Sequence, residues 1–320
     1  MTTDSSKYLA CVIESHKIRK KQALLDKHLA KRDELINALF EHFGKILYAP
    51  FNSGSYAKNT AVNIKFDFDL MTPFKRDAFD TLEQMFTAVY TFLQQQYSTA
   101  ANIRKQKVSI GLEFFRDTEG DVINIDVVPG RELNQDQYPD DQKLNLYVYD
   151  QFGKIAAGSN RLQSRVKAQI ENIREHADKQ AVREVIRLLK IWRIQGGKPY
   201  KSFFLELVTI KAFNNKTIGG DLWQRLKAVL EFIRDNATTL SLPDPGNSNN
   251  DIADSLTDVQ KAALQDDMRC MLEAIESNSD LIQYYFPVNH EFPCKDDKPS
   301  RQGYTVKGEG LTVPPPQRFG

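Results

Sequence analysis

Apolar residues recur with helical spacing from about residue 8 to residue 43, directly before Gly44. Because residues three and four apart share one face of a helix, this pattern predicts one long helix, or two in line. Segments after Gly158 have the same periodicity and predict further helices. These segments are residues 160–177, 180–195, 202–213, 221–237 and 257–277. The C-terminal half should therefore be a bundle of helices.

The region between these helical segments has the patterns of strands and turns. Runs of β-branched and aromatic residues bounded by Gly, Pro, Asn and Asp predict strands, and an amphipathic stretch predicts one helix. The predicted strands are residues 45–55, 65–74 and 144–150, with a hairpin over 105–130 that turns at 118–121, and the helix is 77–97. The predicted fold class is α+β, with a mixed sheet followed by helices.

Two stretches lack periodicity and predict irregular structure. Residues 238–251 are rich in Pro, Gly, Asn and Ser, as exposed turns are. Beyond Phe286, Pro, Gly and Lys are frequent, which predicts a mobile or loosely docked tail. We therefore expect three parts: residues 1–158 with the sheet, residues 159–286 with the helical bundle, and a flexible tail of residues 287–320.

Charge and hydropathy exclude several classes of protein. The 320 residues include 43 Lys and Arg against 42 Asp and Glu, a formal net charge of +1. A balanced charge is not typical of a protein that coats nucleic acid. The apolar runs are shorter than a membrane span, and charged residues occupy the N-terminus where a secretory leader would be apolar. We expect a cytoplasmic protein with no membrane partner.

Cysteine and histidine residues do not predict a structural framework. Cys11, Cys270 and Cys294 are too few and too scattered for a set of disulfides or a metal site, and an odd number fits a reducing compartment. His290 and Cys294 lie near each other but have no second pair of ligands, so no zinc site is expected.

Two aspartates, Asp67 and Asp69, interrupt an apolar strand and are separated by one phenylalanine. Side chains alternate along a strand, so both carboxylates point to one face. Two carboxylates in a poorly solvated site repel each other unless a cation neutralises them. Without nearby His or Cys, these oxygen ligands suit Mg²⁺ or Mn²⁺. The alternative is a surface strand on which the aspartates merely face water.

Gly54 and Ser55 stand shortly before the aspartates, in the segment "NSGSYAKNT". Glycine lets a backbone approach a phosphate closely, and a hydroxyl with free N–H groups binds phosphate oxygens. Gly-Ser is also common in ordinary turns, so the pair indicates a phosphate-binding turn only because it lies ahead of the two aspartates.

A third carboxylate comes from the predicted hairpin. Asp126 lies between Ile125 and Val127 in the return strand, where a charged residue needs a partner or a cation. Glu113 in the preceding strand is a competing candidate, ranked lower because a longer side chain holds a metal less rigidly. The order Gly-Ser, Asp-x-Asp and then a lone Asp allows a two-metal site beside a phosphate-binding turn.

The motifs "GSYAKNTAVNIKFDFDL" and "INIDVVPG" resemble those of the polymerase-β-like nucleotidyltransferases. The segments "REVIRLLKIWR", "KPYKSFFLELV" and "DPGNSNN" are similar to the CD-NTase group, also called SMODS proteins, the bacterial relatives of cyclic GMP-AMP synthase and oligoadenylate synthase. The resemblance covers most of the chain up to about residue 286. It implies a bilobal fold: a mixed-sheet catalytic core with a long N-terminal spine helix, and a helical lobe.

The resemblance implies a role for each residue that matches a family motif. The implied ligands of two Mg²⁺ or Mn²⁺ ions are Asp67, Asp69 and Asp126. Of these, Asp126 would lie next to the attacking 2′- or 3′-hydroxyl and help to deprotonate it. The implied contacts of the donor nucleotide are Gly54, Ser55, Lys190 and Ser202, with Phe203 stacking on a base.

Several residues of the helical segments also have an ordinary structural explanation. Lys190 would be a solvated helix lysine, Ser202 an N-cap of the following helix, and Phe203 a core residue. Glu206, in the same segment, is expected to be a structural partner among the helices rather than a catalyst.

The resemblance implies an enzyme that makes a cyclic di- or trinucleotide second messenger from NTPs, ATP expected among them, for anti-phage CBASS defence. Two-metal nucleotidyl transfer with release of pyrophosphate would join the nucleotides. The alternatives are a linear oligonucleotide synthase, a terminal nucleotidyltransferase acting on tRNA or protein, and an inactive nucleotide-binding sensor. Base choice and linkage are not predicted.

The chain lacks the Cys- and His-rich insertion of the animal DNA sensor and has no basic excess, so no DNA activator is expected, and a monomer is. Its end, "PPPQRFG", is similar to CD-NTases whose C-terminal carboxylate is conjugated by E1- and E2-like enzymes of ubiquitin-transfer type. Gly320 is therefore a candidate conjugation site, and an ordinary disordered end is the alternative.

Overall fold

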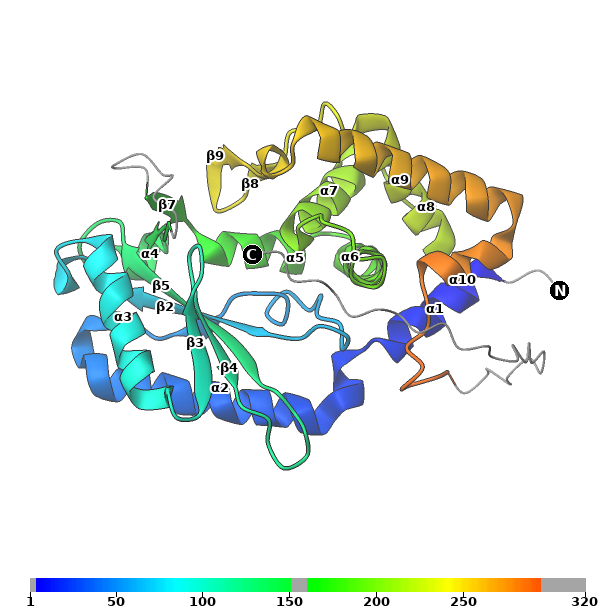
Figure 1. Cartoon of the computed structure of the whole chain (residues 1–320). Coiled ribbons are helices and arrows are strands. Elements are labelled where there is room, and N and C mark those ends of the chain that lie inside the picture. Colours follow the sequence, from blue (N-terminus) through cyan, green and yellow to red (C-terminus); the bar gives the residue numbers. More distant parts are fainter. Residues whose placement is uncertain (1–3, 151–159, 295–320) are drawn as a thin grey trace, which may run out of the picture.

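The computed structural model describes residues 4–150 and 160–294, which form a mixed β-sheet and a group of helices (Figure 1). The sheet and the helices each have a large hydrophobic cluster. A smaller cluster packs on part of the sheet. None of the helices in the described ranges has both the length and the apolar character needed to cross a bilayer.

The N-terminal helical segment is two helices, α1 (Ser5–Ser15) and α2 (Gln22–Phe43), separated by a 3-10 turn at Ile18–Lys21. Gly44 follows α2 with a φ of +56°, a conformation that glycine adopts with little strain. Buried residues of α1 belong to the helical cluster, whereas those of α2 belong to the cluster beneath the sheet (Figure 1). The turn between α1 and α2 therefore lies where the two clusters adjoin.

Within the described residues, the sheet has seven strands and mixed pairing. They are β1 (Phe51–Asn52), β2 (Phe68–Phe74), β3 (Ala101–Lys105), β4 (Ile110–Phe114), β5 (Asn124–Glu132), β6 (Leu144–Tyr147) and β7 (Arg161–Ser164). The order is β1-β2-β5-β4-β3, and β6 pairs with both β5 and β7. The central pair β2 and β5 is parallel, and the other pairs are antiparallel.

One face of the sheet is covered by α2 and by α3 (Leu82–Tyr97). Phe68 and Leu70 of β2 are fully buried in this cluster. Because side chains alternate along a strand, Asp67 and Asp69 point to the opposite face. The apolar side of β2 thus fixes the direction of its acidic side.

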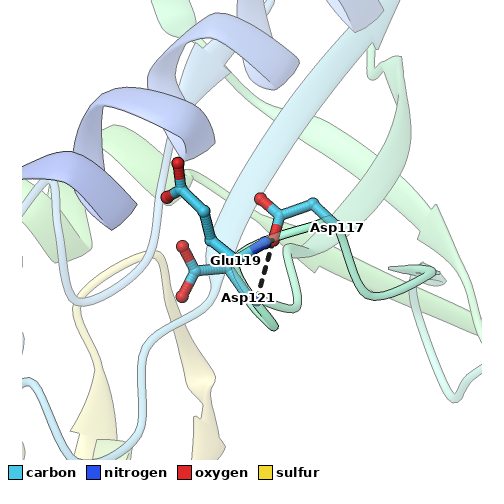
Figure 2. A group of neighbouring side chains, drawn as sticks. All are labelled: Asp117, Glu119 and Asp121. Atoms are coloured by element: carbon cyan, nitrogen blue, oxygen red, sulfur yellow. Dashed lines mark hydrogen bonds between the residues drawn. The ribbon is translucent and has the colours of Figure 1, made fainter.

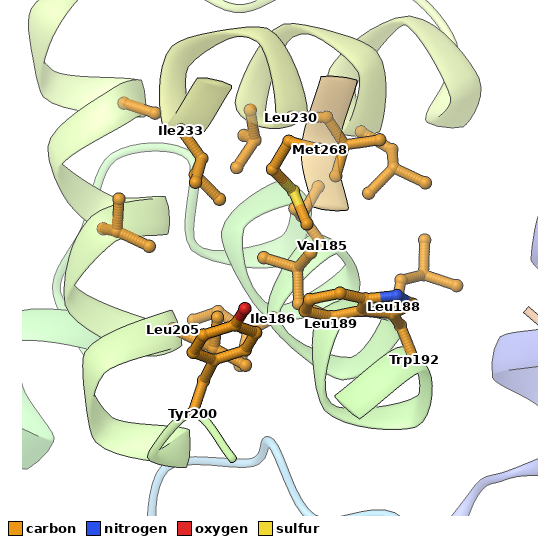
Figure 3. Packing of buried hydrophobic residues seen from close by; sticks show 14 of the residues in the cluster. Val185, Ile186, Leu188, Leu189, Trp192, Tyr200, Leu205, Leu230, Ile233 and Met268 are labelled. Carbon is orange, nitrogen blue, oxygen red and sulfur yellow. The ribbon is translucent and has the colours of Figure 1, made fainter. Parts of the chain in front are cut away.

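The helices that follow the sheet pack around a cluster that includes Trp192, Tyr200 and Met268 (Figure 3). Trp192 and Tyr200 are stacked with ring centroids 5.8 Å apart. The main helices are α5 (Val166–Arg174), α6 (Lys179–Gln195), α7 (Ser202–Asn215), α8 (Leu222–Asn236) and α9 (Asp258–Ser277). Short elements are α4 (Tyr138–Asp141), α10 (Ile282–Tyr285), β8 (Pro243–Asp244) and β9 (Asn247–Asp251).

Several predicted elements differ from the observed ones. The helix predicted over residues 160–177 is wrong at its start, because residues 161–164 form β7 and pair with β6. Strand β3 was missed, because Asn102 and Arg104 are exposed and dilute its apolar pattern. Residues 238–251 are not wholly irregular, since they contain the β8–β9 hairpin. The strand predicted over 45–55 is short: residues 51–52 form β1, and Leu47 makes an isolated bridge to Phe74 of β2.

One disulfide, between Cys11 and Cys294, corrects the expectation of reduced cysteines. The two Cα atoms are 5.9 Å apart although 283 positions separate the residues in sequence. Sequence spacing could not indicate this pair, because α1 and the end of the helical region meet only in the folded chain. Cys270 is free and exposed.

Residues 287–294 follow α10 and pack against α1. Asn289 is buried, and its backbone N–H donates a hydrogen bond of 3.1 Å to Ser15 Oγ. Its side-chain amide donates a bond of 3.0 Å to Asn63 Oδ1. The candidate conjugation site Gly320 lies outside the described residues.

Candidate active site

Asp69 and Asp126 lie next to each other on the two parallel strands at the centre of the sheet. The register pairs Phe68 with Ile125 and Asp69 with Asp126. Both carboxylates therefore leave the same face of the sheet, opposite the buried Phe68 and Ile125. Asp67 precedes β2 and lies on that face as well, so the three predicted aspartates are brought together.

The charges of these aspartates act on one another. Burial, followed by the charges of Asp67 and Asp126, raises the pKa of Asp69 to about 7. Burial and the charge of Asp67 likewise raise the pKa of Asp126. Carboxylates that oppose each other's ionisation gain from a divalent cation that neutralises both. The set consists only of carboxylate oxygens, so it fits Mg²⁺ or Mn²⁺.

Gly54 packs directly against the carboxylate of Asp69. A Cβ at position 54 would collide with Asp69 Oδ2, so only glycine fits there without a shift. The backbone N–H of Ser53 donates a hydrogen bond of 2.8 Å to the carbonyl of Asp69, which fixes the loop to the strand. The predicted Gly-Ser motif and the predicted acidic pair are therefore in direct contact.

Two residues that sequence reasoning missed support Asp126. Gln106 Nε2 donates a hydrogen bond of 3.1 Å to Asp126 Oδ1. Gly111, opposite Asp126 in the β4–β5 register, leaves the room for this bond, since a Cβ there would collide with Gln106 Nε2. The conspicuous Gly in the apolar segment "SIGLEFF" was the one available sequence indication of this close approach.

A cavity of about 290 Å³ lies beside the aspartates. The predicted site residues on its wall are Ser55, Asp67, Asp69, Lys190, Ser202 and Phe203. Gly54 and Asp126 adjoin this wall through Asp69, by contact and by strand register respectively. The cavity wall also includes Lys58 and Glu206. Residues from the sheet region and from α6 and α7 thus share one cavity.

Lys58 and Lys190 share one buried carboxylate, that of Glu206. Lys190 Nζ lies 2.7 Å from Glu206 Oε1 and 2.8 Å from Thr60 Oγ1, and Lys58 Nζ lies 2.8 Å from Glu206 Oε2. Burial favours the neutral acid, but the two lysines prevail and lower the pKa of Glu206 to about 2. Glu206 is thus an ionic partner in the cavity wall, and Lys190 is buried rather than a solvated helix lysine.

Ser202 and Phe203 begin α7 at the edge of the cavity. Lys201, not Ser202, is the N-cap residue, so the capping alternative for Ser202 is wrong. Phe203 packs against the helical cluster and also faces the cavity, where Lys58 Nζ lies 4.7 Å from its ring centroid. Both the core and the cavity interpretations therefore apply to Phe203.

Glu113, the competing third carboxylate, lies away from the cavity wall. It pairs across the strands with Asn124, and its carboxylate is 3.7 Å from the guanidinium of Arg104. The side chain of Glu113 is 43% exposed. Asp126 is therefore the better placed candidate.

A second acidic group lies at the tip of the β4–β5 hairpin (Figure 2). Its carboxylates are those of Asp117, Glu119 and Asp121, with ligand oxygens within 4.8 Å of one another. Lys27 Nζ of α2 lies 2.5, 2.7 and 2.6 Å from them respectively. The single positive charge of Lys27 offsets one of the three negative charges, and its ion pairs hold the hairpin against α2, so this group is a structural contact.

Comparisons with known proteins show that the chain is similar to solved structures in its fold. No family model matches the chain, and no curated protein matches its sequence. CdnC of Escherichia coli MS115-1, solved with ATP, is 20% identical with a TM-score of 0.66, over 88% of this chain and 95% of that chain. The CD-NTase CdnG of Bradyrhizobium diazoefficiens, in complex with GTP, is 14% identical with a TM-score of 0.68, over 89% and 96%.

A third similar structure is that of a protein described by its activity. The cyclic dinucleotide synthase CdnE of Elizabethkingia meningoseptica, with GTP and Apcpp, is 17% identical with a TM-score of 0.58, over 82% of this chain and 97% of that chain. These likenesses confirm the predicted fold, in which a mixed sheet is followed by a helical lobe.

Proposed function

We propose that this chain is a nucleotidyltransferase of the CD-NTase family that joins NTPs into a cyclic di- or trinucleotide and releases pyrophosphate. The observation that carries the proposal is the cavity in which Asp67 and Asp69, with Asp126 alongside, meet Ser55 of the sheet region and Ser202 of the helical region. A fold shared with proteins solved with ATP or GTP supports it.

The three aspartates would hold the metal ions of the reaction. When bound, two Mg²⁺ or Mn²⁺ ions would offset the charge on the attacking and leaving oxygens. Burial and, after it, the repulsion from Asp67 and Asp126 raise the pKa of Asp69, and a bound cation would offset both effects. Because Gly54 has no Cβ, nothing at this position collides with the Asp69 carboxylate.

The donor triphosphate would lie along Ser55 and Ser202, with positive charge supplied from the cavity wall. Two lysines, Lys58 and Lys190, face the single carboxylate of Glu206, so basic groups outnumber acidic groups here. Burial lowers the pKa of Lys190, and the charge of Glu206 opposes that shift. Because Lys190 is already bound to Glu206 and Thr60, it acts as a fixed charge rather than as a mobile phosphate contact. Because the Lys190 side chain is already held in place, it needs little rearrangement when the phosphates bind.

Asp126 would take the proton of the attacking hydroxyl. The hydrogen bond from Gln106 orients its Oδ1 toward the cavity side of the sheet. Phe203, at the cavity edge, offers a ring face to a base, next to the ammonium of Lys58.

A cyclic product requires a second bond in the same cavity, so the linear intermediate must turn and become the donor. We place this activity in anti-phage CBASS signalling, with ATP among the substrates. Conjugation of Gly320 by E1- and E2-like enzymes, the monomeric state and the division at residues 158 and 286 stay predictions.

Release of pyrophosphate tests the proposed reaction. The purified chain should release pyrophosphate from one or more NTP mixtures when Mg²⁺ or Mn²⁺ is present, and EDTA should stop the release. Asp67→Asn/Asp69→Asn and Asp126→Asn should abolish it, whereas Glu113→Gln, which alters the competing carboxylate, should keep it. Release that survives in Asp67→Asn/Asp69→Asn, or none from any mixture, would contradict the proposal.

A further inference from the structure

A second polar cavity, of about 280 Å³, lies behind the Gly-Ser loop. It is formed where the turn between α1 and α2, the loop after Ser55 and helix α6 meet. Three arginines face it: Arg19 from the turn, and Arg183 and Arg187 from successive turns of α6. This cavity is separate from the one beside the aspartates, although Ala61 contributes to the walls of both.

These arginines form no ion pair within the described ranges, although the charge of Glu184 acts on Arg187 from a longer distance. No carboxylate of residues 4–150 or 160–294 lies within 4.0 Å of their guanidinium groups. Arg183 and Arg187 are half-buried, and Arg183 Nε is buried with no hydrogen-bond partner among those residues. Burial lowers the pKa of both groups; the charge of Glu184 opposes the shift of Arg187, and the like charges of Arg183 and Arg19 add to it. A buried donor and unpaired charges are costly unless a ligand satisfies them.

The arginine cavity is tied to the loop that carries Ser55. Arg187 Nη2 donates a hydrogen bond of 2.6 Å to the carbonyl of Asn59, whose φ of +56° is uncommon for a residue other than glycine. Arg174 Nε of α5 donates one of 2.8 Å to the carbonyl of Ala57. On its other side, the same loop holds Lys58 against Glu206. The loop thus lies between the two cavities, and Arg187 holds its backbone from the arginine cavity, whereas Arg174 holds it from a neighbouring one.

We propose that this second cavity is a binding site for a small anion that bears several phosphate groups. Arg19, Arg183 and Arg187 bind its oxygens, and the bound anion holds Arg187 in place against Asn59, which stabilises the loop of residues 54–61. The planar guanidinium group is suited to paired hydrogen bonds with phosphate oxygens. The anion site is a property of this cavity alone, whereas its effect on catalysis rests on the proposed function.

The size of the cavity favours a small ligand over a nucleic acid. Its volume is near the lower end of small-molecule pockets, which begin at about 300 Å³. A polyphosphate carries several negative charges in a volume this small. The chain as a whole has a net charge of only +1, with no general excess to follow a long nucleic-acid backbone.

Calorimetric titration of the full chain with inorganic tripolyphosphate in EDTA tests the site. EDTA removes metal-dependent binding beside the aspartates. We expect one site per chain, with binding weakened about tenfold or more by Arg183→Gln and by Arg19→Gln. The matched control Arg269→Gln removes an exposed arginine that is paired with Asp266 at 3.0 Å, and Ser55→Ala alters the other cavity; both should bind as the wild type does.

Three results would overturn the assignment. They are no binding of tripolyphosphate, binding that Arg183→Gln and Arg19→Gln leave unchanged, and binding lost in Ser55→Ala but kept in Arg183→Gln. A short duplex DNA that binds more tightly than tripolyphosphate and depends on the same arginines would overturn the choice of a small ligand.

Hydrogen exchange of the loop tests the coupling. Tripolyphosphate should slow amide exchange in residues 54–61 of the wild type and should leave it unchanged in Arg183→Gln. Exchange that tripolyphosphate does not slow in the wild type overturns the coupling. Neither measurement uses NTP turnover, so a failure here is distinguishable from a failure of the proposed enzyme activity.

Discussion

Gly54 lies against the carboxylate of Asp69 with no room for a Cβ between them. This contact joins the loop proposed to bind phosphate to the strand proposed to bind metal. The backbone bond from Ser53 to the carbonyl of Asp69 holds the two segments in register. If the proposed function holds, the fold would set the spacing between triphosphate and metal before any substrate binds.

The contact between Gly54 and Asp69 predicts the effect of a single methyl group. In Gly54→Ala the new Cβ would collide with Asp69 Oδ2 and displace it, so pyrophosphate release should fall about 100-fold. Gly219→Ala is the matched control, because a Cβ there meets no atom within 4 Å. Equal activity of the two variants would show that the position of the Asp69 carboxylate does not matter.

The raised pKa of Asp69 predicts how the metal-free protein responds to pH. Its folded pKa is about 7 against an ordinary value of 3.8, so the folded state binds more protons between these values. The contribution of this group to the free energy of unfolding is full below about pH 4 and is lost as pH rises through 7. In EDTA, that free energy should decline with pH more steeply in the wild type than in Asp69→Asn. Urea unfolding at several pH values measures both slopes, and equal slopes would contradict the prediction.

The buried carboxylate of Glu206 predicts a large stability effect. Glu206→Gln leaves Lys58 and Lys190 buried without their shared counter-charge, so the free energy of unfolding should fall by about 3–5 kcal/mol. Urea unfolding near pH 7 measures this loss. Glu276→Gln, which removes an exposed partner of Lys227, is the control and should change the stability little.

The same carboxylate has a defined pH window. The folded pKa of Glu206 is about 2, lowered from 4.5, so its stabilising contribution is present above about pH 4.5 and is lost as pH falls toward 2. The wild type should therefore lose more stability than Glu206→Gln over this acid range. A parallel acid response of the two proteins would contradict the ion-pair account.

The disulfide between Cys11 and Cys294 predicts a redox-dependent stability. Reduction should lower the free energy of unfolding by about 2–4 kcal/mol, because the bond ties α1 to the segment that follows α10. Cys11→Ser/Cys294→Ser should show the same loss and no further response to dithiothreitol, whereas Cys270→Ser should behave as the wild type does. The readout is urea unfolding with and without dithiothreitol. A response to dithiothreitol that survives in the double variant would count against the bond.

The acidic part of the candidate site could be predicted because it depends on local pattern. Alternation along one strand places Asp67 and Asp69 on one face, and an isolated charge in an apolar strand singles out Asp126. Strand register then brings Asp69 beside Asp126, as the central parallel pair shows.

Contacts between distant segments could not be predicted in the same way. Glu206 meets Lys58 across 148 positions, and Gln106 reaches Asp126 from a strand connection whose first strand, β3, has a weak apolar pattern. The Cys11–Cys294 bond likewise depends on how the segment after α10 packs on α1, and the arginine cavity on how the α1–α2 turn meets α6. Such contacts follow from tertiary packing, which neither periodicity nor residue spacing encodes.

The most direct test of the central claim is the nature of the product made from labelled NTPs with Mg²⁺ or Mn²⁺. After phosphatase treatment, the account predicts a resistant nucleotide with the mass of a cyclic di- or trinucleotide, absent from Asp67→Asn/Asp69→Asn. A phosphatase-sensitive ladder, a label transferred to tRNA or protein, or no product from any NTP mixture would contradict it.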